Sequence, residues 1–259
     1  MQGGKIYKTV GVLLVIGLGM SACGDDGGSG DLPSGGSGDA SPGGIWAGQV
    51  EFADSGETIE TMGLCTEEGE LRFLNGDGEK TTGTFTVKGN EFDAEFTSYA
   101  LSGQLFPQND LPVITGTATG YVYEKDAITG DASYLGGEPA FSFRILYDQT
   151  YERGSSLSAI AGTYTYSEAG GSSVTYTIGS NGDLSGSNSD GCQVAGSVAI
   201  INPDYNMYRA TMTFSDCSQN NGTYRGLAAL LDEVGEENNT LAISVANESY
   251  MLSVFLLGS

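Results

Sequence analysis

From residue 44 onward the sequence resembles itself in two successive halves. Three pairs of segments match in the same order along the chain: 44–46 with 162–164, 69–97 with 182–214, and 116–123 with 222–229. One such match would carry little weight, but three in register indicate a duplicated domain of about 100 residues, a common domain size. The repeat therefore predicts two domains of one fold, at 44–147 and 159–259, joined by the polar stretch 148–158.

The longest matching segments alternate between apolar and polar residues. Because side chains alternate along a strand, three apolar residues of the first half share one face, and so do their counterparts. The matched sets are Phe92, Ala94 and Phe96 in the first half, and Tyr208, Ala210 and Met212 in the second. This pattern is typical of half-buried antiparallel strands.

Glycine and turn-forming pairs separate these short strands. The chain has 41 glycines and 6 prolines, no convincing helical stretch, and about eight expected strands in the second half. Tight turns between short strands favour an antiparallel meander, which removes its exposed edges by closing into a barrel. We therefore expect an all-β protein with two tandem antiparallel up-and-down β-barrels. A barrel of eight strands has room inside for side chains or one small ligand.

The ionisable residues exclude several functions. The chain contains no histidine, which excludes catalysis through a Ser-His-Asp or Cys-His arrangement and any metal site with a histidine ligand. The formal net charge of −23 argues against nucleic acid as a partner, because affinity for nucleic acid comes mostly from lysine and arginine. We expect neither a cofactor nor a bound metal.

The N-terminus has the pattern of an export signal. Lys5 and Lys8 precede an apolar run at 10–20, which is too short to span a bilayer. The segment Met20-Ser21-Ala22-Cys23 resembles the bacterial lipobox, with methionine in place of the usual aliphatic residue. The resemblance implies removal of residues 1–22 and acylation of Cys23, and a protein with several acyl chains is stably membrane-anchored. An ordinary secretory signal with an incidental cysteine is the alternative.

The residues after Cys23 predict a tether and a location. The segment 23–43 is rich in glycine, serine and aspartate and has too few apolar residues to fold. Gly24 stands where an aspartate commonly marks retention in the inner membrane, so we expect a palmitoylated lipoprotein of the outer membrane. Its periplasmic or cell-surface exposure stays open.

The first strand expected in each half carries a short motif. Gly44-Ile45-Trp46 and Gly162-Thr163-Tyr164 resemble the opening motif of calycins, the lipocalin-like barrels, and the small barrels of Gram-negative surface lipoproteins. The resemblance implies the barrel architecture. We expect Trp46 and Tyr164 to plug one end of each barrel.

Two of the remaining cysteines flank one predicted hairpin. Cys192 and Cys217 lie near its open end, and an exported protein folds in an oxidising compartment, so we expect them to form a disulfide. Matching the apolar faces pairs Val198 with Met212, which requires a bulge or frayed end beside Cys217. Cys65 aligns with Ile178 in the repeat and is expected to be a buried, unreactive thiol rather than a reactive one.

Two further groups of polar residues are better explained as turns and solvent-facing side chains than as metal-binding or catalytic sites. The segments 75–79 and 187–191 hold carboxylates and amides that suggest Ca²⁺ ligands, but they lack the full loop spacing and are expected to be turns. Asp93 and Glu95 share a strand face that should point to solvent, which weakens the case for a hydrolase with paired carboxylates.

The leading hypothesis is a non-catalytic lipoprotein that binds, adheres to or supports an envelope partner. The alternative is a carrier with a small apolar ligand inside a barrel.

Overall fold

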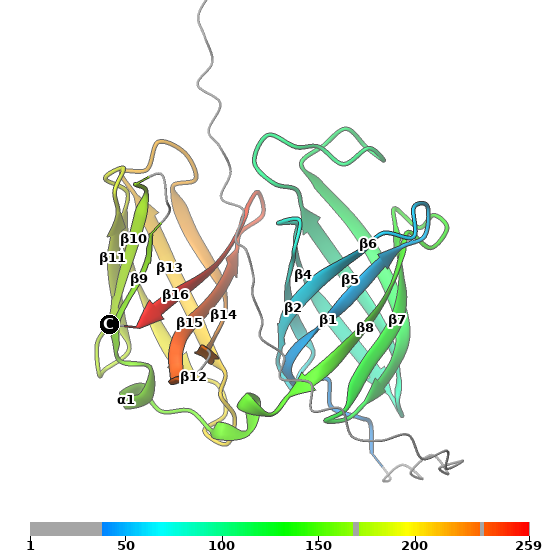
Figure 1. The fold of residues 1–259 in the computed structure, drawn as a ribbon, viewed down its shortest axis with the longest axis horizontal. Coiled ribbons are helices and arrows are strands. Elements are labelled where there is room, and N and C mark those ends of the chain that lie inside the picture. Colours follow the sequence, from blue (N-terminus) through cyan, green and yellow to red (C-terminus); the bar gives the residue numbers. More distant parts are fainter. Residues whose placement is uncertain (1–37, 168–170, 234–235, 259) are drawn as a thin grey trace, which may run out of the picture.

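The structure, a computed structural model, describes residues 38–167, 171–233 and 236–258. It contains two closed antiparallel barrels that lie side by side (Figure 1), which confirms the predicted fold class. In barrel 1 each strand pairs with the next along the chain, and β8 closes onto β1. In barrel 2 the last strand, β16, closes onto β9 in the same way.

Within the described residues, sixteen strands form the two barrels. Barrel 1 consists of β1 (Gly44–Phe52), β2 (Thr58–Cys65), β3 (Glu70–Asn75), β4 (Lys80–Lys88), β5 (Glu91–Tyr99), β6 (Val113–Tyr123), β7 (Ala127–Tyr134) and β8 (Phe141–Asp148). Barrel 2 consists of β9 (Gly162–Ser167), β10 (Ser173–Ile178), β11 (Asp183–Asn188), β12 (Gln193–Ile200), β13 (Tyr208–Ser215), β14 (Gly222–Glu233), β15 (Glu236–Ala246) and β16 (Met251–Gly258).

Two short helices connect the barrels, and the sequence analysis missed both. The 3-10 helix η1 (Gln149–Arg153) and the helix α1 (Leu157–Ile160) are too short for an apolar period to show in the sequence. Side-chain caps start them instead: Asp148 Oδ1 accepts from Thr150 N at 2.9 Å, and Ser156 Oγ accepts from Ala159 N at 3.1 Å. None of the helices in the described ranges is long and apolar enough to cross a membrane.

The strand registers confirm most of the internal repeat. Gly83 pairs with Phe96 in barrel 1, and their predicted counterparts Gly196 and Met212 pair in barrel 2. Likewise Gly44 pairs with Cys65, and Gly162 with Ile178, so the predicted match of Cys65 with Ile178 is correct. The two barrels therefore share one register over their first five strands.

Two predicted registers are wrong by two residues. Phe96 pairs with Gly116 in barrel 1, whereas its counterpart Met212 pairs with Tyr224, so Gly116 corresponds to Tyr224 rather than to Gly222. In the hairpin of β12 and β13, Val198 pairs with Ala210, not with Met212. A shift of two residues keeps every side chain on its face, so face matching cannot detect it.

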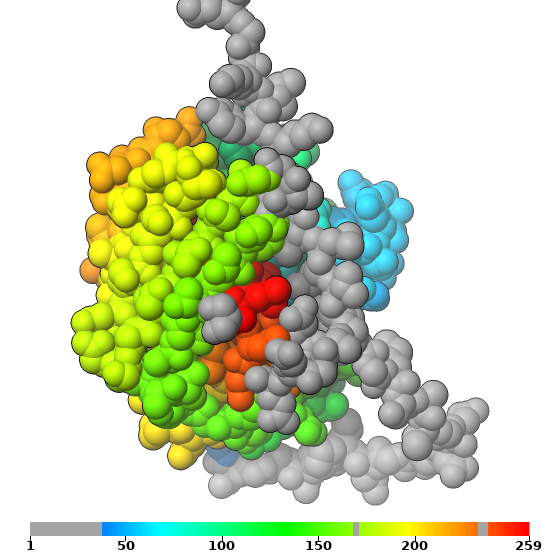
Figure 2. Space-filling model, turned by 60° about the vertical axis from the view of Figure 1, so that its left-hand side comes forward, coloured from blue at the N-terminus to red at the C-terminus, as the bar shows by residue number. Residues whose placement is uncertain are grey.

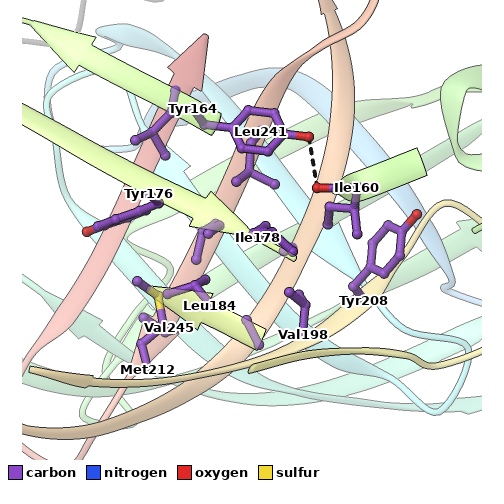
Figure 3. Close-up of a cluster of buried hydrophobic side chains, with 14 of the residues drawn as sticks. Ile160, Tyr164, Tyr176, Ile178, Leu184, Val198, Tyr208, Met212, Leu241 and Val245 are labelled. Atoms are coloured by element: carbon purple, nitrogen blue, oxygen red, sulfur yellow. Dashed lines mark hydrogen bonds between the residues drawn. The ribbon is translucent and has the colours of Figure 1, made fainter. Parts of the chain in front are cut away.

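The same end of each barrel is closed by an aromatic residue of the predicted motif. Trp46 Nε1 donates to the Pro42 carbonyl at 3.0 Å, and the Tyr164 hydroxyl donates to the Ile160 carbonyl at 3.0 Å. Both acceptors lie four residues before the aromatic residue. Figure 3 shows Tyr164 and Ile160 with Tyr208 at this end of the barrel 2 core. The predicted plugs are thus confirmed in position and share one hydrogen-bonding arrangement.

Each barrel places one aromatic residue opposite one glycine on its second and third strands. The aromatic residue stands on the third strand in barrel 1 and on the second strand in barrel 2. In barrel 1, Gly63 of β2 faces Phe73 of β3, and a Cβ on Gly63 would lie 2.1 Å from the ring. In barrel 2, Tyr176 of β10 faces Gly186 of β11, where a Cβ would lie 2.5 Å from the ring. Each aromatic ring therefore needs a glycine opposite, because protein interiors leave no room for both side chains.

The closing seams differ between the barrels. Strands β1 and β8 pair from Ile45 to Phe52, whereas the described parts of β9 and β16 pair only through Thr165 and Tyr164 with Leu257 and Gly258. Figure 2 shows this side of the molecule, where the red end of β16 reaches the surface beside green residues. Leu256 is nevertheless fully buried, so the short seam still covers the core.

An apolar layer holds the two barrels together. Met62 and Leu64 point outward from β2 and belong to one buried cluster with Leu227 and Ala229, which point outward from β14. Tyr151 of η1 stacks on Tyr205 at the edge of this layer, with the ring centroids 4.6 Å apart. We call this cluster the interbarrel layer: Ile45, Met62, Leu64, Tyr151, Met207, Leu227 and Ala229.

Candidate functional site at the mouth of barrel 2

The barrel ends opposite the aromatic plugs differ between the two barrels. In barrel 1 the loop 100–112 folds over this end, and its Phe106 is buried against Tyr134 with ring centroids 5.8 Å apart. The interior below contains a cavity of only about 70 Å³, lined mainly by apolar side chains such as Phe85, Phe96 and Ile145. Ligand pockets typically measure about 300–1,000 Å³, so barrel 1 offers a carried ligand little space.

A carboxyl group lies under this lid in barrel 1. Glu79 Oε1 accepts a hydrogen bond of 2.9 Å from the Tyr134 hydroxyl. Burial raises the pKa of Glu79 to about 7, against the opposing effect of hydrogen bonds from Ser98 and Tyr134. Burial and the neighbouring Glu79 also raise the pKa of Tyr134, so that its hydroxyl stays protonated. Glu79 therefore changes its charge near neutral pH.

We predict that Glu79 makes stability fall as pH rises through the range from about 4.5 to 7. The pKa of Glu79 in the folded protein lies above the ordinary value of a glutamate, so the folded state binds the proton more tightly than the unfolded state and is favoured below this range. The free energy of unfolding of Glu79→Gln, measured by urea denaturation at pH 5 and pH 8, should vary less with pH than that of the parent protein. An equal variation in both proteins would contradict this role.

In the part of the chain that the structure describes, no loop folds over the corresponding end of barrel 2, which we call the mouth. It holds a pocket of about 340 Å³ between three loops of barrel 2 and Ser102 from the lid loop of barrel 1. The three loops join β11 to β12, β13 to β14, and β15 to β16, and Figure 1 shows them at the top of the barrel. Barrel mouths and domain interfaces are preferred places for ligand sites, and this pocket lies at both.

Aromatic and apolar side chains form the floor of the pocket. Tyr224 is buried, and its hydroxyl donates to the Asn220 carbonyl at 2.9 Å. Phe214 meets Tyr224 edge to face at 5.2 Å between centroids, and Tyr250 does so at 6.5 Å. Phe214, Tyr250 and Leu252 are only partly buried against the core. Partly exposed rings on a buried, hydrogen-bonded base give a rigid apolar contact surface.

The loops around this floor are fixed by local interactions. The predicted disulfide joins Cys192 to Cys217 with a Cα–Cα distance of 4.2 Å and anchors the β13–β14 loop to the start of β12. Asn188 Oδ1 accepts from the backbone N–H groups of Asp190 and Cys192, at 3.0 and 2.9 Å. Asn221 Oδ1 accepts from Cys217 N at 3.0 Å. The rim is therefore preorganised, which lowers the cost of binding a ligand.

Several polar side chains of the rim have no partner. Within the described part of the chain, no hydrogen bond or ion pair engages the Asp190 carboxylate or the side-chain amides of Gln219 and Asn220. No lysine or arginine of the described ranges lines the pocket. The rim thus offers a carboxylate and neutral amides to a ligand, and no positive charge.

Removal of the disulfide should loosen the mouth and lower stability. The bond closes a loop with a sequence separation of 25, for which chain entropy predicts about 3 kcal/mol. The double variant Cys192→Ser, Cys217→Ser should lose about this free energy of unfolding in urea denaturation, and amide exchange should accelerate at 216–221. A loss below about 1 kcal/mol, with unchanged exchange, would show that the bond does not order this loop.

Two larger hollows lie on the outer face of barrel 1. Their volumes are about 710 and 760 Å³, and outward-facing threonines and acids such as Thr119, Asp131 and Glu95 line them. The side chains there stand on open sheet faces rather than around an enclosed space. We therefore take the mouth of barrel 2 as the candidate site.

The remaining candidates from the sequence are placed as follows. Asp93 and Glu95 lie exposed on the outer face of β5, and Cys65 is fully buried with a pKa that burial raises. Across the described residues, no cluster of three or more aspartate, glutamate or cysteine side chains could hold a metal ion. The segment 187–191 forms part of the rim, a role that the sequence analysis missed. Cys23 lies outside the described residues.

The fold and this geometry define the protein as a pair of fused small β-barrels, one lidded and one with an open mouth. Comparisons with protein families, curated proteins and solved structures find no match to the chain. Its function must therefore be argued from its own residues.

Proposed function

We propose that the protein is a lipid-anchored bacterial envelope lipoprotein with a non-catalytic binding role, in which the mouth of barrel 2 is the binding site. The order of a basic start, an apolar run, two small residues and Cys23 supports the anchor. The acyl chains on Cys23 hold the protein at the outer membrane, and the residues that follow Cys23 space the barrels from the lipid surface. Residues 39–43 of the predicted tether do not belong to this spacer, because Ala40 N donates to the Gly89 carbonyl at 2.6 Å and the buried Pro42 accepts from Trp46 Nε1.

The open mouth is the observation that carries the binding role. It combines partly exposed rings, fixed loops and unpaired polar groups in one pocket of about 340 Å³. The corresponding end of barrel 1 is closed by Phe106. The absence of histidine throughout the chain, together with the solvent-facing position of Asp93 and Glu95, gives no support to an enzyme. A carrier of apolar ligands is also poorly supported, because the cavity of barrel 1 is small.

Photo-cross-linking in intact cells tests the binding role. A photoreactive residue replaces Ser218 at the rim, and in a matched protein it replaces Tyr121, which is 44% exposed on the outer face of barrel 1. We expect a discrete adduct from position 218 and none, or a different one, from position 121. Equal, diffuse labelling from both positions would contradict a binding site at the mouth.

A further inference from the structure

We propose that the mouth of barrel 2 binds a neutral saccharide. The inference rests on the proposed binding role and adds the chemical class of the ligand. The charge of the pocket excludes anionic ligands, and its mixture of polar and apolar side chains excludes purely apolar ligands. The fixed loops around the pocket favour binding of a ligand that matches them.

The charge of the pocket excludes anions. Among the described residues of the lining, Asp190 is the one charged side chain, and no lysine or arginine accompanies it. The whole chain carries a formal net charge of −23, which adds to the repulsion of any anionic group. Phosphorylated, sulfated or carboxylated ligands would therefore meet only negative charge and hydrogen-bonding amides.

The polarity of the pocket calls for a ligand with two kinds of surface. Phe214, Tyr250 and Leu252 offer partly buried apolar contact, whereas the exposed side chains of Asp190, Gln219 and Asn220 have no hydrogen-bond partner among the residues that the structure describes. A purely apolar ligand would bury those polar groups without partners, which costs free energy. A sugar ring meets both needs, because its C–H face packs on an aromatic ring and its hydroxyls both donate and accept hydrogen bonds.

A quaternary ammonium ion is the nearest competing ligand. Such a cation would be attracted by the rings and by Asp190, as in an aromatic cage. The quaternary ammonium group has no donor or acceptor for the amides of Gln219 and Asn220, however, and Tyr224, one ring of the lining, is only 2% exposed. The amide-rich rim therefore favours the saccharide.

Both barrels contribute to the site. Ser102 of the lid loop of barrel 1 lines the pocket, and the Tyr99 hydroxyl donates to the Asn247 carbonyl of the β15–β16 loop at 3.1 Å. This hydrogen bond fixes the β15–β16 loop, which contains Tyr250, against barrel 1. One wall of the pocket therefore depends on the position of barrel 1 beside barrel 2.

Titration with defined sugars tests the proposal. The full mature chain, in a detergent without a sugar headgroup, is titrated with maltotriose, cellotriose and tri-N-acetylchitotriose, and in parallel with trigalacturonate and choline. Calorimetry and saturation-transfer NMR measure binding. We expect at least one neutral trisaccharide to bind with a Kd of about 1 mM or tighter, and neither charged probe to do so.

Variants locate the bound sugar. Tyr250→Ala and Gln219→Ala should each weaken binding by about tenfold or more, whereas Tyr250→Phe should retain it because the ring remains. Gln219 is exposed, so its substitution leaves folding intact. Tyr121→Ala is the matched control, since it removes an exposed ring outside the mouth and should not change the Kd.

Three results would overturn the proposal: no binding of any neutral trisaccharide, binding that is unchanged in both mouth variants, or preferential binding of choline or trigalacturonate. The cross-linking experiment separates this failure from that of the binding role. An adduct from position 218 with no sugar binding would retain the mouth as a binding site and reject the saccharide.

Discussion

Trp46→Ala should cost about 3–5 kcal/mol of the free energy of unfolding, the range typical of a large aromatic residue removed from a core. Trp46 is 0% exposed, and its ring lies edge to face with Tyr147 at 5.2 Å between centroids. The substitution leaves a cavity at the plugged end of barrel 1 and removes the hydrogen bond to the Pro42 carbonyl. Urea denaturation followed by circular dichroism measures the loss.

Two controls separate the contributions of Trp46. Trp46→Phe keeps most of the ring but not the N–H donor, so it should lose less than Trp46→Ala. Tyr121→Ala removes an exposed aromatic side chain and should change the free energy of unfolding by less than about 0.5 kcal/mol. If Trp46→Ala cost no more than Tyr121→Ala, the assigned role of Trp46 as a plug of barrel 1 would be wrong.

Leu227→Asp should break the interbarrel layer. Leu227 is 0% exposed and packs in one cluster with Met62 and Leu64 of barrel 1. An unpaired carboxylate there must be hydrated, which separates the barrels at a cost of about 3–5 kcal/mol. We expect the parent protein to unfold in one transition and Leu227→Asp to unfold in two, and proteolysis within 149–161 to accelerate in the variant.

The control for this variant is Leu257→Asp. Leu257 is an outward-facing leucine of barrel 2 that is 47% exposed, so the same change of residue should have little effect there. Leu227→Ala provides a milder test, because it shortens the side chain without adding charge. If Leu227→Asp unfolds in one transition at the parent's urea midpoint, the barrels do not depend on this layer for their pairing.

The sequence predicts much of each barrel because one face of most strands is polar. Alternation and turn residues give the number of strands, and the repeat gives equivalences such as Gly83 with Gly196. The interbarrel layer escaped the analysis, although the sequence contains its signal. The runs at 62–65 and 227–231 contain no polar residue and do not alternate, as expected for strands buried on both faces.

The site was less accessible to sequence reasoning than the fold. The mouth is open because the loop 216–221 is short and tied by a disulfide, whereas the loop 100–112 is long enough to cover barrel 1 with Phe106. Loop length is visible in the sequence, but where a loop folds depends on contacts between distant residues. Tyr224 and Tyr250 also look like ordinary core residues in a strand pattern, and only the structure brings them beneath the same rim.

The central claim is that these barrels act at a membrane, held there by Cys23. Mass spectrometry of the N-terminal peptide of the mature protein tests it most directly, with Cys23→Ala as the control. We expect a peptide that begins at Cys23 and carries a diacylglyceryl group on its sulfur, and an uncleaved, unacylated chain from Cys23→Ala. A mature peptide with an unmodified Cys23, or normal cleavage and acylation of Cys23→Ala, would contradict the account.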